Sequence, residues 1–95
     1  LAKAFMFVKN DNNWEIEKLG KIINKQRLTI PNKSLNIFSY ENDLDPGNLS
    51  RIENGLIEPK ITMLWRISEA LDIKLSHLIQ ILEKELGENF YLIEK

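Results

Sequence analysis

The chain has 95 residues, of which 43% are hydrophobic and 28% charged, and its formal net charge at pH 7 is -1. This length suffices for one small domain, and the composition is typical of a globular protein. The absence of cysteine excludes disulfides and thiolate metal sites and fits a reducing cytoplasm, and no apolar run approaches the roughly 20 residues of a membrane span. Because the net charge does not favour nucleic acid, any basic surface must be local.

The chain is predicted to begin with an N-terminal tail, residues 1–13, in which AFMFV has the composition of a strand and KNDNN that of a turn. The first helix is predicted from Trp14 to about Arg27, because apolar residues recur there at helical spacing. Pro31 excludes a longer helix, since proline lacks an amide proton and restricts the residue before it. The apolar stripe of this helix comprises Ile16, Leu19, Ile22 and Ile23.

Two short helices are predicted next. Ser34 can cap the first of them, which extends to about Asn42. The second covers residues 46–54, with Asp45 suited to its N-cap, a proline in its first turn and a glycine after its end. Leu44 is expected to plug the turn between the two helices. The bounding proline and glycine are Pro46 and Gly55, and the residues that face inward from the first helix are Leu35 and Phe38.

A fourth and a fifth helix complete the predicted domain, which covers residues 14–86. Pro59 and Thr62 bracket the start of the fourth helix, and Gly87 ends the fifth. Their apolar stripes comprise Leu64, Ile67, Ala70 and Leu71, and then Leu75, Leu78, Ile79 and Leu82. Residues 87–95 are predicted to form an extended C-terminal tail. The predicted fold class is therefore all-α, a compact domain of five short helices that leaves room for short β-strands at both ends.

The helix 46–54 carries very little apolar surface for a core element. With about 100° between successive residues, Leu49 and Ile52 fall on one side, whereas Arg51 lies on the other with Asn48 flanking it. An isolated helix this short is marginal in water, so a tight turn must hold it against its predecessor. This is a helix-turn-helix arrangement, which can place one helix in the major groove of DNA. There Arg51 can pair with guanine and Asn48 with adenine.

The segment NLSRIENG, followed by PKITMLWRISEALDIKLSHLI, resembles the lambda-repressor-like (Xre/Cro type) helix-turn-helix family. In that family a Ser-Arg-Ile/Leu-Glu-Asn/Arg-Gly segment ends the recognition helix, and a proline and a Leu-x-x-Ile/Leu helix follow. The register upstream agrees, because Ser34 opens the second helix and Phe38-Ser39 stand at the family's Leu-Ala pair. The resemblance covers about residues 15–82. It implies a five-helix fold that binds double-stranded DNA, usually as a homodimer on a two-fold-related operator.

The resemblance also implies roles for individual residues. The base-contacting positions are Pro46, Gly47, Asn48 and Arg51. The phosphate-contacting positions are Lys33, Ser34, Asn54 and Lys60. A charged pair that ties the first helix to the recognition helix in many members is matched by Arg27 and Glu53. This pair is structural, and removing one partner should cost several kcal/mol if it is buried, because the other charge is stranded.

The sequence also departs from the family pattern near the recognition helix. Asn42 and Asp43 replace the usual apolar residue and glycine before the turn, and Pro46 and Gly47 leave two reading positions almost without side chains. Asp43 and Asp45 lie beside the expected phosphate path, where DNA repels carboxylates. Base readout is therefore expected to be sparse and helped by DNA shape, unless affinity for DNA has faded.

Several apolar residues do not belong to the predicted stripes. They are the dimerisation candidates Trp65, Phe90, Tyr91, Leu92 and Ile93. Either they complete a small core, or they form a self-association surface, because a terminal strand with unpaired backbone groups readily pairs with its two-fold mate. The stretch AFMFV could join such a sheet.

The leading functional prediction is a cytoplasmic, sequence-specific DNA-binding transcriptional regulator, a dimeric repressor. The alternative is a helix-turn-helix scaffold used as a protein-interaction module, such as an antitoxin or an accessory regulator with weak DNA binding, whose partner is a toxin or another regulator. An enzyme is not expected: the sequence has no Gly-rich phosphate loop or Ser/His/Asp order, and His77 has no second histidine beside it. No metal or cofactor is expected either.

Overall fold

The computed structural model describes residues 13–93, and within this range the chain forms five α-helices and no β-strand. The helices are α2 (Trp14–Leu28), α3 (Leu35–Glu41), α4 (Pro46–Glu53), α5 (Ile61–Ala70) and α6 (Leu75–Leu86). The predicted all-α fold class is confirmed. None of the described helices is long and apolar enough to cross a membrane.

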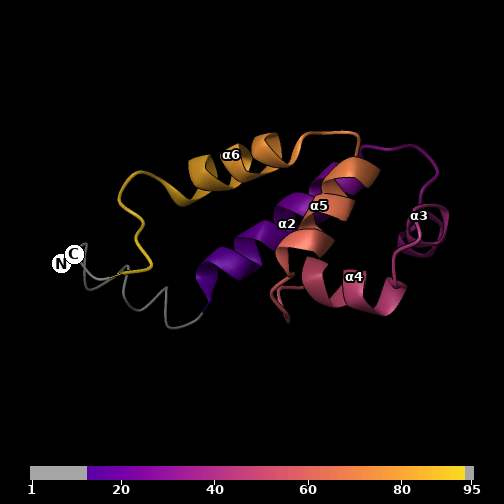
Figure 1. The fold of residues 1–95 in the computed structure, drawn as a ribbon, viewed down its shortest axis with the longest axis horizontal. Helices are drawn as coiled ribbons and strands as arrows, with labels where there is room; N and C mark the ends of the chain where they lie inside the picture. The colour runs from indigo at the N-terminus through magenta and orange to yellow at the C-terminus, as the bar shows by residue number, and fades with distance from the viewer. Residues whose placement is uncertain (1–12, 94–95) are drawn as a thin grey trace.

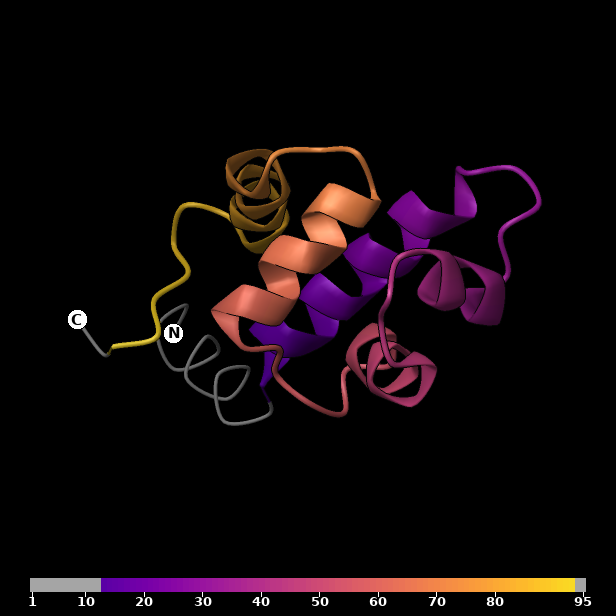
Figure 2. The same cartoon turned by 45° about the vertical axis from the view of Figure 1, so that its right-hand side comes forward.

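Helix α2 runs through the middle of the molecule, with α6 on one side of it and α4 on the other (Figure 1). Helix α3 packs against α4, and α5 packs against α6. Seen from the second direction, α3 and α4 lie together at one end of the molecule, away from the C-terminal segment that follows α6 (Figure 2). Helix α4, which carries the predicted base-contacting positions, thus packs against α2 and α3, away from the segment that follows α6.

Capping residues determine where the short helices begin and end. The Ser34 hydroxyl accepts a hydrogen bond from the backbone N–H of Ile37 at 3.2 Å, and Asp45 Oδ2 accepts one from the N–H of Asn48 at 2.8 Å. Gly55, which follows α4, has a φ of 72°, a conformation that costs a residue with a side chain more than it costs glycine. Both predicted N-caps are present in the structure.

One apolar core is shared by all five described helices and by the turn before α4. The buried members are Leu19, Ile22, Ile23, Phe38, Leu44, Leu49, Ile52, Leu64, Ile67, Leu71 and Leu78. Leu44 is 6% exposed, which agrees with its predicted place as the plug of the turn. Other stripe residues are only half-buried and pack at the edge of this core, among them Leu35, Ala70, Leu75, Ile79 and Leu82.

The predicted fold leaves room for short β-strands at both ends of the chain. The AFMFV stretch lies outside the described residues. After α6, Gly87 and the following residues form turns and bends, with the N–H of Phe90 donating to the carbonyl of Gly87 at 3.3 Å. The Phe90 ring lies 5.7 Å from that of Trp14, centroid to centroid, so this segment returns to the start of α2. A C-terminal strand paired with a second copy stays a prediction, because a single chain offers it no mate.

Candidate nucleic-acid interface

Helix α4 has a sealed side and an open side. Leu49 and Ile52 are 0% and 1% exposed, and Glu53 beside them is buried too. The predicted base-contacting residues form the other side, which we call the outward side of α4: Pro46, Gly47, Asn48 and Arg51. Pro46, Asn48 and Arg51 are exposed and Gly47 is half-buried. The orientation that groove insertion requires is therefore present in the monomer.

The turn between α3 and α4 explains two departures from the family pattern. Asp43 stands where the family has glycine, and it adopts the left-handed conformation with a φ of 56°. Aspartate is one of the few residues with a side chain that visits this conformation routinely. The Asn42 side-chain amide donates to the carbonyl of Phe38 at 2.8 Å, which satisfies a carbonyl at the end of α3. The unusual sequence thus still forms the tight turn.

A glycine allows α2 and α4 to approach each other closely. A Cβ atom built on Gly20 would lie 2.3 Å from the carbonyl oxygen of Ile52 and 2.9 Å from that of Glu53. No side chain fits there without moving one of the helices. The backbone of α4 therefore rests directly on that of α2, which sets how far the outward side projects.

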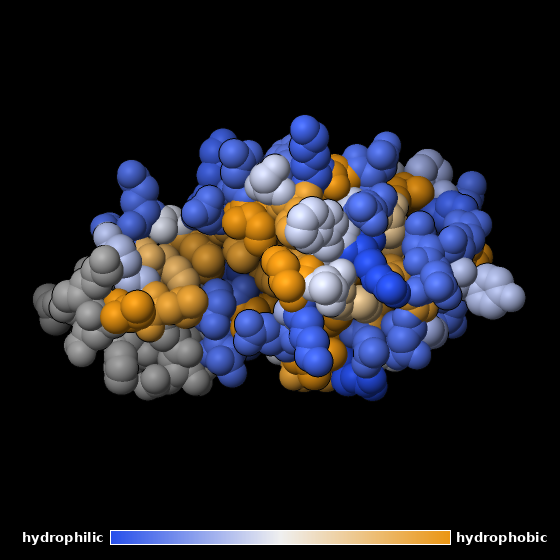
Figure 3. Space-filling model, viewed as in Figure 1, coloured by the Kyte–Doolittle hydropathy of each residue, from blue (hydrophilic) through white to orange (hydrophobic). Residues whose placement is uncertain are grey.

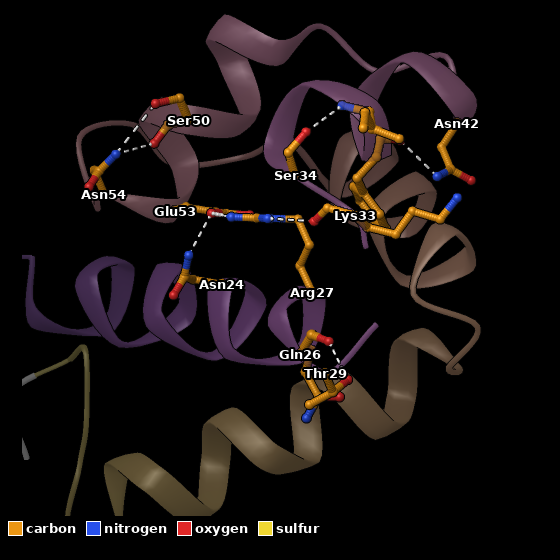
Figure 4. Close-up of polar contacts among 12 residues, drawn as sticks. Asn24, Gln26, Arg27, Thr29, Lys33, Ser34, Asn42, Ser50, Glu53 and Asn54 are labelled. Atoms are coloured by element: carbon orange, nitrogen blue, oxygen red, sulfur yellow. Dashed lines mark hydrogen bonds and ion pairs between the residues drawn. The ribbon is translucent and has the colours of Figure 1, made fainter. Parts of the chain in front are cut away.

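A buried ion pair fixes the C-terminal end of α4 (Figure 4). Arg27 of α2 donates from Nε to Glu53 Oε2 at 2.7 Å and from Nη2 to Glu53 Oε1 at 2.9 Å. Asn24 adds a bond to Oε1 at 2.8 Å, and Arg27 Nη1 reaches the carbonyl of Lys33, ahead of α3, at 3.2 Å. Hydrogen bonding to Glu53 raises the pKa of Arg27 more than burial lowers it. The predicted pair thus joins α2, α4 and the start of α3.

Two residues of the outward side contact each other. Arg51 Nη2 donates to Asn48 Oδ1 at 2.6 Å, so the two predicted base readers form one unit. The guanidinium lies near Gly47, since a Cβ built on that glycine would be 3.6 Å from both of its terminal nitrogens. From the sequence alone, Arg51 and Asn48 are predicted to pair with two different bases, guanine and adenine. Their spacing of three residues on a helix is the signal that indicates contact.

The predicted phosphate contacts have different surroundings. Lys33 forms an ion pair with Glu41, and the Asn54 amide donates to the carbonyl of Ser50 at 2.8 Å. Ser34 is exposed and uses its oxygen as a cap, which leaves its hydroxyl hydrogen for another acceptor. Lys60 is exposed at the start of α5, and no ion pair involves it within residues 13–93.

The dimerisation candidates do not form one cluster. Trp65, a residue of α5, is 54% exposed and lines a hollow together with residues of α6. The C-terminal candidates line a second hollow beside the end of α6. Apolar atoms extend over α5 and toward the C-terminal segment on the face seen in Figure 3. Leu92 and Ile93 are exposed, and Phe90 is half-buried against Trp14.

The geometry agrees with a comparison to known protein families. A family model described as helix-turn-helix matches residues 43–78, from the turn before α4 into α6. No curated protein and no solved structure matches the chain significantly. The family is one of DNA-binding regulators rather than of enzymes. Residues 43–78 are accordingly similar to a helix-turn-helix family, and the matched stretch includes α4 and α5.

Proposed function

We propose that this protein is a sequence-specific transcriptional repressor of the cytoplasm that binds DNA as a homodimer and inserts α4 into the major groove. The observation that carries the proposal is the orientation of α4, with Leu49 and Ile52 sealed beneath it and Asn48 and Arg51 in solvent. A groove about 12 Å wide admits one helix, whose N-terminal side chains meet the base edges. Because most residues on the outward side are small, the backbone of α4 can come close to the base edges.

Contacts with the DNA backbone would position the helix. Ser34 precedes α4 in the sequence, Lys60 follows it, and both are exposed. A hydroxyl and an ammonium can each donate to phosphate oxygens. Glu41 partly neutralises the charge of Lys33, and the Asn54 amide already donates to the Ser50 carbonyl, so each can offer a phosphate only its remaining donors. The electrostatic share of the affinity is therefore expected to be small, with few counterions released per chain.

A dimer would present two copies of α4 about 34 Å apart, one turn of DNA. The proposed contact surfaces are Trp65 on α5 and the C-terminal residues Phe90, Tyr91, Leu92 and Ile93. Occupancy of a two-fold-related operator would repress transcription by excluding other proteins from the same DNA.

The test measures fluorescence anisotropy of labelled duplexes with the full chain at about 50 and about 200 mM salt. Binding that weakens at the higher concentration supports the proposal. On a selected site, Arg51→Ala should cost about 1–3 kcal/mol of binding free energy and relax specificity at the bases it reads. Lys60→Ala is the matched control: it should weaken all sequences alike and flatten the salt slope by about one unit. An unchanged sequence preference in Arg51→Ala would refute groove insertion by this side.

A second candidate is a protein-interaction module, such as an antitoxin whose partner is a toxin. It is favoured by the exposed carboxylates Glu41, Asp43 and Asp45 around α4, which repel DNA, and by exposed apolar surface at Trp65 and Leu92. The same anisotropy measurement separates the two candidates. If no duplex binds at either salt concentration, the interaction module is the better description.

A further inference from the structure

An acidic residue stands at the N-terminal end of the outward side of α4. Asp45 is the N-cap of this helix, and it is exposed. Its Oδ2 atom accepts a hydrogen bond from the backbone N–H of Asn48 at 2.8 Å. This bond holds the carboxylate in one orientation. The second oxygen, Oδ1, has no hydrogen-bond partner within residues 13–93.

The carboxylate lies close to the guanidinium of Arg51. A Cβ built on Gly47 would lie 3.3 Å from Asp45 Oδ2 and 3.6 Å from both terminal nitrogens of Arg51, so the two charged groups flank one point of the outward side. No ion pair within residues 13–93 joins them. The carboxylate of Asp45 is therefore placed among the base-contacting positions and can still accept a hydrogen bond from a ligand.

The chemistry of a carboxylate limits which bases it can contact. An ionised carboxylate accepts hydrogen bonds and cannot donate them. In the major groove, cytosine and adenine present an amino donor, whereas guanine and thymine present a keto oxygen, which is an acceptor. An amino group can donate to the carboxylate, but a keto oxygen is repelled by it. Because every base pair contains one base of each kind, the contact distinguishes which strand carries the amino group.

Resting on the proposed DNA-binding function, we propose that Asp45 is a further base-reading residue, whose Oδ1 accepts a hydrogen bond from the amino group of cytosine or adenine. Side chains at the N-terminus of a recognition helix are the ones that meet base edges. Repulsion between the carboxylate and the phosphates lowers the affinity for every duplex, and the amino contact offsets this only where the base is suitable. Asp45 thus lowers affinity and raises specificity, whereas the sequence alone predicts only repulsion at this position.

The experiment selects bound duplexes from a random library with the full wild-type chain and with Asp45→Asn. Asparagine caps a helix about as well as aspartate, so the urea unfolding midpoint should stay near that of the wild type. Its amide oxygen can take the bond from the Asn48 N–H, and its NH₂ then replaces Oδ1 and only donates. We expect Asp45→Asn to bind all duplexes more tightly. At one base pair its preference should change from an amino to a keto base, with about a tenfold change in discrimination.

The matched control is Asp43→Asn. It removes the same charge from the same turn, and asparagine tolerates the left-handed conformation that Asp43 adopts at a φ of 56°. This variant should also bind more tightly than the wild type, but it should select the same sequence. If the wild type and Asp45→Asn select the same sequence, the amino contact is refuted and the DNA-binding function stands. Absence of salt-dependent duplex binding by the wild type and both variants would refute both proposals.

Modified duplexes give a second readout. In the selected site, the base assigned to Asp45 is replaced by an analogue without the amino group, purine for adenine or 2-pyrimidinone for cytosine. The replacement should weaken wild-type binding more than binding by Asp45→Asn, and this comparison removes the effect of the altered base pair itself. Equal losses in the two proteins would show that Asp45 does not contact the amino group.

Discussion

The two sides of α4 belong to one eight-residue helix, but one side is buried and the other faces solvent. On the side facing α2, Glu53 is buried in three hydrogen bonds with Asn24 and Arg27, and the backbone touches that of Gly20. On the outward side, Asn48 and Arg51 hold only each other. Contacts on the sealed side hold α4 in position, and the outward side is therefore available for contacts outside the chain. Substitutions on the two sides should therefore separate stability from DNA binding.

The largest effect is expected from breaking the sealed side with Glu53→Ala. Arg27 would stay buried without its partner, because its side chain is only 8% exposed, and stranding such a charge costs about 3–5 kcal/mol of the free energy of unfolding. Urea-induced unfolding measures this loss. Thermal unfolding should report the same ranking of variants.

Two variants control this prediction. Glu85→Ala removes the partner of Lys18 in a pair whose side chains are 29% and 49% exposed, and it should cost less than about 1 kcal/mol. The double variant Arg27→Met with Glu53→Leu replaces both charges by apolar groups and should recover most of the loss. A Glu53→Ala protein no less stable than Glu85→Ala would show that the ion pair does not hold α4.

A second way to break the same side is Gly20→Ala. The new methyl group would overlap the carbonyl oxygen of Ile52, 2.3 Å away, so α4 must shift. Overpacking of this kind costs about 1–3 kcal/mol, more than the roughly 1 kcal/mol that alanine gains over glycine within a helix. The matched control is Gly47→Ala on the outward side, where the nearest atoms are 3.3 Å away or farther and stability should change little. Equal unfolding midpoints for the two variants would contradict the comparison.

Much of the sealed side could be predicted from the sequence, because local chemistry determines it. Asp45 and Gly55 bound α4 as their capping preferences predict, and the helical spacing of Leu49 and Ile52 identifies the buried face. The Arg27 pairing came from the family resemblance instead. The further hydrogen bond that Asn24 donates to Glu53 was not predicted, although Asn24 lies three residues before Arg27 on the same helix.

The solvent-facing residues on and around α4 were harder to predict, because their contacts depend on rotamers and join separate elements. Lys33 and Glu41 are eight residues apart, in a loop and in α3, so no periodicity within one element relates them. The Asn48–Arg51 bond is one of several arrangements open to two exposed side chains, and the pattern of residue types does not choose among them. The sequence also marked Asp43 as a departure without showing that it adopts the conformation of the glycine it replaces.

The variant Glu41→Gln tests whether Lys33 contributes to DNA binding. The substitution removes the carboxylate that engages Lys33 and leaves this lysine free for a phosphate. Duplex affinity should rise by about 0.2–1 kcal/mol, the range of exposed ion pairs, and the salt slope should steepen by up to about one unit. Glu83→Gln makes the same charge change on α6 and should have a smaller effect. Equal gains from both variants would mean that net charge, rather than Lys33, sets the affinity.

The smallest predicted effect is an increase in stability, and it comes from a buried serine in the core. The Ser39 hydroxyl is fully buried without a hydrogen-bond partner, whereas that of Ser68, equally buried, donates to the carbonyl of Trp65 at 2.7 Å. A buried unpaired polar group is destabilising, so Ser39→Ala should raise the free energy of unfolding by about 0.5 kcal/mol, while Ser68→Ala should lower it or leave it unchanged. Because neither residue belongs to the outward side, duplex affinity should stay the same in both. A Ser39→Ala protein less stable than the wild type would indicate that this hydroxyl has a partner, such as a buried water, in solution.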